Sequence, residues 1–168
     1  MALADELLDR NREYAQGAFA GPRPVRPRRA LAIVACMDSR MDMFAMLGLD
    51  PGDAHVLRNA GGVVTDDVIR SLALSQRKLG TREILLVQHT SCGLSMTTED
   101  EFKDELETDT GLRPTWAVEA FREVKDSVRT SLARLRHSVF LPHKDNIRGF
   151  VYDVHTGTLH EVLSPGQG

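Results

Sequence analysis

Two short segments of the chain carry side chains that bind metals. Cys36 and Asp38 stand two residues apart, so one extended stretch can point both side chains the same way. His89 and Cys92 stand three residues apart across a predicted turn. Two thiolates, one imidazole and one carboxylate form a tetrahedral ligand set that suits zinc. These residue types therefore indicate a zinc site, provided that the two segments meet in space.

The same residues allow other interpretations. A single buried cysteine is usually a small apolar residue, and a disulfide between Cys36 and Cys92 is the main structural alternative to a metal site. A reducing compartment disfavours that disulfide, which would also leave Asp38, Arg40 and His89 without a role. A dithiol redox site is a weaker alternative, because the chain contains no Cys-x-x-Cys motif.

The surrounding sequence predicts the elements that must position these segments. Apolar runs over Leu31–Ala35 and Glu83–Val87 indicate strands buried on both faces, and Ala54–Leu57 is a shorter strand between them. The two segments that hold the candidate metal ligands directly follow the first and third of these strands. Ligands of open parallel sheets bind beyond the carboxyl ends of the strands, so four candidate ligands would converge on one crevice.

Helices are predicted after the strands. Thr65 can cap a helix within Val63–Leu79, and Thr98 with Glu101 forms a capping box for a short acidic helix that ends near Leu106. The alternation predicts an α/β fold whose central sheet is mainly parallel, has about four to five strands and is flanked by helices.

The C-terminal third is predicted to contain one more helix and the last strands. Apolar residues recur at spacings of three and four in a helix that opens at Pro114 and Thr115. Val139–Leu141 is predicted to be a short strand. Phe150–Val154 and Thr158–Val162 flank a turn-like segment and are predicted to form a hairpin at the sheet edge.

Composition restricts the class of protein. The chain has 168 residues and a net charge of -3, and it is 42% hydrophobic and 27% charged, as is ordinary for one folded domain. No apolar run approaches the roughly 18 residues that span a bilayer. The near-neutral charge gives no reason to expect nucleic acid binding. We therefore expect a cytoplasmic protein that binds neither membranes nor nucleic acid.

The first 30 residues read as an arm outside the core of a single domain, 1–168. Residues 1–20 predict an amphipathic helix whose apolar positions have no local neighbour to pack on. Residues 21–30 hold three prolines and four arginines and predict an extended linker. The zinc-binding core is then residues 31–163, and we expect the helix to lie against another part of the fold or against another subunit.

Three motifs together resemble those of the β-class carbonic anhydrases, and most closely their short bacterial and mycobacterial branch. The motifs are Cys36-x-Asp38-x-Arg40, Arg58-Asn59-Ala60-Gly61-Gly62 and His89-x-x-Cys92-Gly93. The resemblance implies the β-carbonic anhydrase fold and one zinc per chain, held by Cys36, His89 and Cys92. It also implies that Asp38 is a switchable fourth ligand and that Arg40 is its alternative partner.

This resemblance implies the reversible hydration of carbon dioxide to bicarbonate and a proton by a zinc-bound hydroxide. Asp38 and Arg40 would be the catalytic residues and would open the site as pH rises. The resemblance places the loop beside the substrate, so the pocket would be lined by Asn59, Ala60, Gly61 and Gly62. It also implies a homodimer, or a tetramer made of two such dimers, in which the N-terminal helix embraces the partner.

Two other functions stay open at the level of sequence. The same scaffold could hydrolyse carbonyl sulfide or carbon disulfide, or the chain could be a catalytically silent zinc-binding protein. A proton shuttle is not identified, although residue type makes candidates of His55, His143, His155 and His160.

Overall fold

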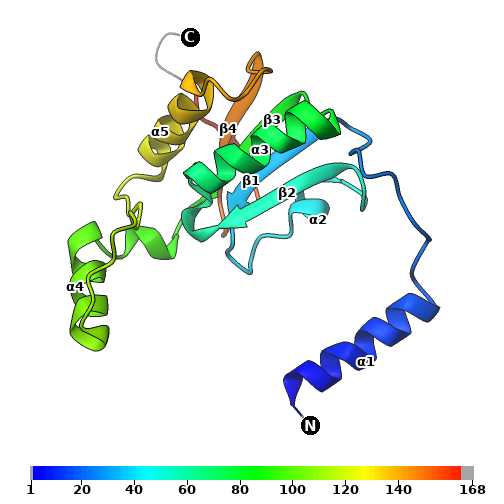
Figure 1. The fold of residues 1–168 in the computed structure, drawn as a ribbon, viewed down its shortest axis with the longest axis horizontal. Coiled ribbons are helices and arrows are strands. Elements are labelled where there is room, and N and C mark those ends of the chain that lie inside the picture. Colours follow the sequence, from blue (N-terminus) through cyan, green and yellow to red (C-terminus); the bar gives the residue numbers. More distant parts are fainter. Residues whose placement is uncertain (1, 164–168) are drawn as a thin grey trace.

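The computed structural model describes residues 2–163 and has an α/β architecture (Figure 1). The elements are α1 (Leu3–Gln16), β1 (Leu31–Cys36), α2 (Met43–Leu47), β2 (Ala54–Asn59), η1 (Ala60–Gly62), α3 (Asp66–Leu79), β3 (Glu83–His89), η2 (Gly93–Ser95), α4 (Glu99–Thr110), α5 (Val124–His137), β4 (Asn146–Tyr152) and β5 (Leu159–Glu161). The sheet has five strands in the order β2-β1-β3-β4-β5. Its first four strands are parallel and β5 is antiparallel to β4, which confirms the predicted fold class.

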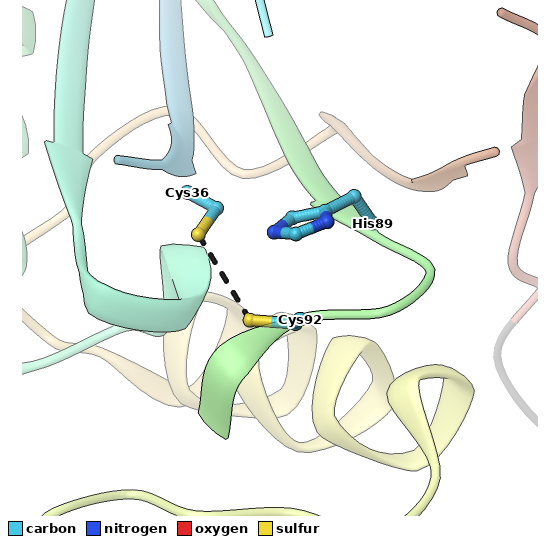
Figure 2. Close-up of side chains that lie close together, drawn as sticks. All are labelled: Cys36, His89 and Cys92. Carbon is cyan, nitrogen blue, oxygen red and sulfur yellow. Dashed lines mark hydrogen bonds between the residues drawn. The ribbon is translucent and has the colours of Figure 1, made fainter. Parts of the chain in front are cut away.

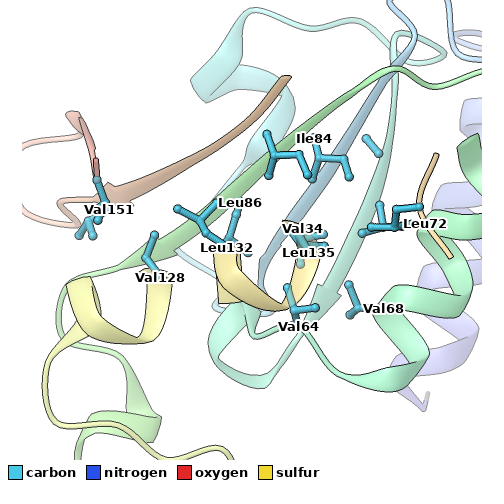
Figure 3. Close-up of a cluster of buried hydrophobic side chains, with 14 residues drawn as sticks. Val34, Val64, Val68, Leu72, Ile84, Leu86, Val128, Leu132, Leu135 and Val151 are labelled. Carbon is cyan, nitrogen blue, oxygen red and sulfur yellow. The ribbon is translucent and has the colours of Figure 1, made fainter. Parts of the chain in front are cut away.

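The main core lies between the sheet and the two helices α3 and α5 (Figure 3). Leu72 of α3 and Leu132 of α5 are fully buried against strand residues that include Val34 and Leu86. A second buried cluster lies on the opposite face of the sheet and contains both cysteines. β1 is buried at every position because it is flanked by strands on both edges and by side chains on both faces.

Two predicted helix starts are confirmed by their hydrogen bonds. The Thr65 hydroxyl accepts a hydrogen bond from the backbone N–H of Val68 at 3.4 Å and caps α3. The Thr98 hydroxyl accepts from the Glu101 N–H at 3.2 Å, and the Glu101 carboxylate accepts from the Thr98 N–H at 2.9 Å. The helix that follows this capping box is longer than predicted and ends at Thr110.

Two predicted elements of the C-terminal third are wrong. The helix expected from Pro114 begins only at α5, because the N–H groups of Val118 and Glu119 donate to the Glu99 side chain and Glu119 has a left-handed φ of 62°. The strand expected at residues 139–141 is a turn, in which the Phe140 N–H donates to the Ser138 hydroxyl. The predicted hairpin is present, and its first strand, β4, begins earlier, at Asn146.

The N-terminal arm stands away from the rest of the molecule (Figure 1). α1 covers most of the predicted segment 1–20, of which Met1 lies outside the described residues, and none of the residues of α1 is buried. The linker after it is fixed at its far end, where Arg28 and Arg29 donate from Nε to the buried Asp53 carboxylate at 2.9 and 3.2 Å. Within residues 2–163, no helix combines the length and the apolar character that crossing a membrane requires.

Candidate metal centre

Three of the four predicted ligands meet where β1 and β3 end. Cys36 is the last residue of β1, His89 is the last residue of β3, and Cys92 follows in the turn before η2. Their side chains point toward one another in Figure 2, and their ligand atoms all lie within 4.8 Å of one another. The two Sγ atoms are 4.0 Å apart and both cysteines are free, so the alternative of a disulfide is not what the structure contains.

His89 is held in the tautomer that a metal ligand needs. Its Nδ1 lies 2.8 Å from the Thr90 carbonyl oxygen, which can only accept, so Nδ1 carries the proton. In the neutral imidazole, Nε2 is therefore the acceptor, and it faces the two cysteines. The residue is 1% exposed, and Nε2 has no hydrogen-bond partner among the described residues. A buried acceptor beside two thiols is what a divalent cation such as zinc would satisfy.

The two thiols share negative charge unequally. The hydrogen bond between the two sulfur atoms lowers the pKa of Cys36, while the same contact and burial raise the pKa of Cys92. Burial disfavours a charged His89, but the Cys36 thiolate and the Thr90 carbonyl outweigh burial and raise the pKa of the imidazole. The site therefore already favours an anionic sulfur, which is the protonation state that binds metal.

Asp38 lies next to this triad and is engaged by Arg40. The guanidinium donates from Nε to Oδ1 at 2.9 Å and from Nη2 to Oδ2 at 2.7 Å, a two-donor fork. These hydrogen bonds hold the pKa of the Asp38 carboxyl well below its usual range. Oδ2 is 3.6 Å from Nε2 of His89. Asp38 is thus ionised and close to the triad, with its charge directed at Arg40.

Arg58 holds the segment that carries Cys36 and Asp38. It donates from Nε to the Cys36 carbonyl at 2.9 Å and from Nη2 to the Asp38 carbonyl at 2.6 Å. Because Arg58 is on β2, these hydrogen bonds attach the end of β1 to β2 beyond the last residue pair that the two strands form. The geometry of the triad is therefore supported by backbone contacts as well as by side chains.

Cys36 and Cys92 of the triad line a cavity of about 610 Å³, here called the metal-site cavity. Of the predicted pocket residues, Asn59, Ala60 and Gly61 line it. The Asn59 side chain both donates to and accepts from the backbone of Val63, which closes the loop around η1. A larger apolar part of the wall is formed by Val63, Leu94, Phe102, Trp116 and Val118.

Gly62 has a different place in the structure and is not among the residues that line the metal-site cavity. A Cβ at Gly62 would lie 2.6 Å from the Cys36 nitrogen and 2.8 Å from the Ala35 carbonyl carbon. The absence of a side chain lets η1 pack directly on the backbone of β1, immediately behind the cysteine.

The wall contributed by residues 116–119 was not predicted from sequence. The Glu99 carboxylate accepts from the N–H groups of Val118 and Glu119 at 3.0 and 3.2 Å and so folds this segment over the cavity. Lys103 lies 2.9 Å from Glu99 and, together with these N–H groups, lowers the pKa of the Glu99 carboxyl. Glu99 at the start of a helix looks like an ordinary first-turn acid, so the sequence held no signal for this contact.

This chain is similar to known proteins over most of its length. The family model described as carbonic anhydrase matches residues 31–117. Beta-carbonic anhydrase 1 of Mycobacterium tuberculosis is 52% identical over 162 residues, which covers 96% of this chain and 99% of that protein. A carbon disulfide hydrolase of Acidianus is 34% identical over 188 residues, covering 97% of this chain and 89% of that protein.

Solved structures show the same arrangement. A carbonic anhydrase from Streptococcus mutans superposes with a TM-score of 0.91 at 41% identity and covers 97% of this chain and 99% of its own. A carbonic anhydrase from Glaciozyma antarctica superposes with a TM-score of 0.88 at 34% identity, covering 97% of this chain and all of its own. The fold of this chain, over nearly its whole length, is thus a known one.

Proposed function

Because this chain belongs to the β-class carbonic anhydrases, we propose that it catalyses the reversible hydration of carbon dioxide to bicarbonate and a proton. The observation that carries the proposal is the buried triad of Cys36, His89 and Cys92, with its unpartnered imidazole nitrogen. We propose that these three residues hold one zinc ion per chain. Zinc bound there supplies Lewis-acid chemistry: it lowers the pKa of a water molecule to roughly 7.

The residues of the metal-site cavity are proposed to bind and position carbon dioxide. The molecule is small and has no net dipole, so the apolar side chains of Val63, Leu94 and Phe102 suit it better than water. Asn59 holds the polar edge of this wall in place through its two hydrogen bonds to Val63. Substrate would therefore meet the triad from the side on which η1 and the 116–119 segment close the cavity.

Asp38 and Arg40 are proposed to control access to the metal position. In the structure the Asp38 carboxylate is directed at Arg40, which would leave a coordination position of a bound metal open to water. Its Oδ2 lies 3.6 Å from Nε2 of His89 even in this arrangement, so without Arg40 the carboxylate could turn to become a fourth ligand. Asp38 stays ionised in both arrangements, so the expected pH dependence would come from the water that a bound zinc would activate and not from titration of the carboxyl group. Activity is expected to rise between roughly pH 7 and 8.5.

We also propose that the enzyme is a homodimer, or a tetramer of two such dimers, joined through α1. Leu7 and Leu8 are more than half exposed on a helix that touches no core, and Asp53 holds the linker that carries it. Exposed apolar stripes of this kind are buried in stable proteins by a partner. We further propose a cytoplasmic location, where metal-binding thiols are kept reduced.

The decisive test joins metal analysis to stopped-flow measurements of carbon dioxide hydration across pH. We expect about one zinc per chain, and we expect the Cys36→Ser/Cys92→Ser double variant to lose it. His160→Gln, a change on the exposed edge strand β5, is the control that should keep both zinc and activity. Full zinc content in the double variant would refute the ligand assignment, and zinc without turnover at alkaline pH would point to a silent binding protein.

Hydrolysis of carbon disulfide is the second candidate function, because the chain is 34% identical to proteins of that name over nearly its whole length. Carbon disulfide and carbonyl sulfide are linear triatomic molecules that the same apolar wall can accept. A comparison of kcat/KM for the three substrates on one preparation separates the functions. We expect carbon dioxide to be preferred, and a higher value for either sulfur compound would reverse the assignment.

A further inference from the structure

Each turnover of the proposed reaction leaves one proton to be removed. Carbon dioxide and water give bicarbonate and a proton, and the proton must reach solvent before the site can react again. Asp38 is a poor acceptor, because both of its oxygens already accept hydrogen bonds from Arg40. Around the metal-site cavity, the described lining holds one other carboxylate, that of Glu119.

Glu119 stands in the wall between two cavities. Beyond the metal-site cavity lies a second, open cavity of about 700 Å³, here called the outer hollow, at the start of α3 and the end of α5. The residues that line both cavities are Thr65, Trp116, Ala117 and Glu119. Of these four residues, Glu119 is the one with a carboxylate side chain.

The backbone of Glu119 is strained, and hydrogen bonds hold the residue in place. Its φ of 62° is left-handed, which is unfavourable for a side chain of this kind and persists only where surrounding contacts impose it. The Glu99 carboxylate accepts from its N–H at 3.2 Å, and Arg134 donates to its Oε1 at 2.6 Å. Oε2 has no hydrogen-bond partner among the described residues. One oxygen is therefore anchored and the other is available to a proton.

His137 is the histidine that lines the outer hollow. His137 is exposed, and its Nδ1 lies 2.8 Å from the Ala133 carbonyl oxygen, so in the neutral ring Nδ1 carries the proton and Nε2 is the acceptor. Imidazole is the side chain that ordinarily exchanges its proton near neutral pH. The other charged residues that line the hollow are Asp66, Asp67 and Arg134.

We propose that Glu119 and His137 carry the proton of the hydration reaction from the metal-site cavity to solvent, an inference that rests on the proposed function. The proton released by the attacking water binds Glu119 at Oε2. Solvent in the outer hollow passes it to Nε2 of His137, and a buffer base removes it. No bond other than those to the proton changes, and Glu119 and His137 return to their starting states.

The experiment separates proton removal from the chemical step. His137→Gln and Glu119→Gln are compared with the wild type in a weak buffer that contains no imidazole. Since kcat/KM covers only the steps through conversion of carbon dioxide, we expect it to be unchanged, whereas kcat should fall about tenfold or more. Glutamine at residue 119 keeps a carbonyl oxygen for Arg134 but cannot carry a proton. Added imidazole should restore kcat of the His137→Gln variant.

Two further measurements sharpen the outcome. Oxygen-18 exchange at equilibrium should show normal interconversion of carbon dioxide and bicarbonate with slowed release of labelled water, at full zinc content. The double variant should be no slower than the worse single variant, because both residues serve one path. Controls are His160→Gln, on strand β5, and Glu105→Gln, on the exposed side of α4.

The proposal is overturned if kcat is unchanged in both variants, or if kcat and kcat/KM fall together. The first result would mean that protons leave by another route, and the second would mean that the residues only shape the cavity. A wild-type protein that binds zinc but does not interconvert carbon dioxide and bicarbonate would overturn the proposed function and this inference with it.

Discussion

His89 and Asp38 are neighbours that differ in how their hydrogen-bonding capacity is used. The Nε2 of His89 is buried and has no partner among the described residues, whereas both oxygens of Asp38 accept from Arg40. The first arrangement is costly without a cation, since an unsatisfied buried acceptor costs about 1–3 kcal/mol. The second is stable as it stands. We therefore propose different roles for the two residues, a permanent ligand and a displaceable carboxylate, although both were predicted as ligands.

Arg40→Lys tests whether the fork matters or only the charge. Lysine keeps the positive charge but cannot donate from two nitrogens to two carboxylate oxygens. We expect activity near neutral pH to fall roughly tenfold to a hundredfold, as loss of a charge-assisted hydrogen bond of about 1.5–3 kcal/mol implies. Zinc content should not change. Arg129→Lys, which alters an exposed ion pair with Asp126, is the control. If Arg40→Lys is as active as this control, the two-donor fork is not needed for activity.

Gly62→Ala is expected to damage the ends of β1 and β3. The new Cβ would approach the Cys36 nitrogen to 2.6 Å, and backbone cannot move aside as a side chain can. Gly111→Ala is the matched control, because Gly111 has a similar left-handed φ and a methyl group added there would have no atom within 4 Å. The control should lose about 1 kcal/mol of unfolding free energy in urea, and Gly62→Ala should lose clearly more. Equal losses would show that the contact with Cys36 is unimportant.

At the scale of elements, the sequence predicted what depends on neighbours in the chain. The apolar runs of β1 and β3 and the cap at Thr65 are local patterns, and they appear in the structure where expected. The irregular segment before α5 depends instead on Glu99, some twenty residues away. Apolar spacing alone cannot reveal that the N–H groups of Val118 and Glu119 are already occupied, so the helix was predicted too early.

Glu99→Ala should loosen the 116–119 segment without unfolding the sheet. The change removes the acceptor for two backbone N–H groups and the partner of Lys103. We expect the amides of Val118 and Glu119 to exchange with deuterium faster, by roughly tenfold for a loss of about 1.4 kcal/mol of local stability. Exchange in β3 should stay the same. Glu105→Ala is the control, and equal exchange in both variants would argue against the contact.

For the molecule as a whole, the sequence predicted the site better than it predicted the cavity around it. Cys36, His89 and Cys92 lie at the ends of adjacent strands, and that adjacency follows from the order of a parallel sheet. The cavity wall forms where α4 meets the 116–119 segment, and the outer hollow lies between that segment, the start of α3 and the end of α5. Such contacts between distant parts of the chain leave no periodic pattern in the sequence.

Removal of residues 1–20 tests the role of the arm in the whole assembly. α1 contributes no buried residue to its own chain, so its loss should leave the core folded and zinc bound. We expect light scattering at micromolar concentration to show a smaller species than the full-length protein. Leu7→Ser/Leu8→Ser, which keeps the helix but removes its apolar stripe, should act in the same direction. A full-length protein that is already monomeric would exclude this assembly.

The ribosome makes α1 before any strand of the sheet, because α1 precedes every strand in the chain. At about 5–20 residues per second, the ribosome needs roughly seven to thirty seconds to add the core after the helix has been made. Throughout that time the apolar stripe has no surface to cover it. The charged residues that flank its leucines are then its protection against aggregation, and they are Asp5, Glu6, Asp9, Arg10, Arg12 and Glu13.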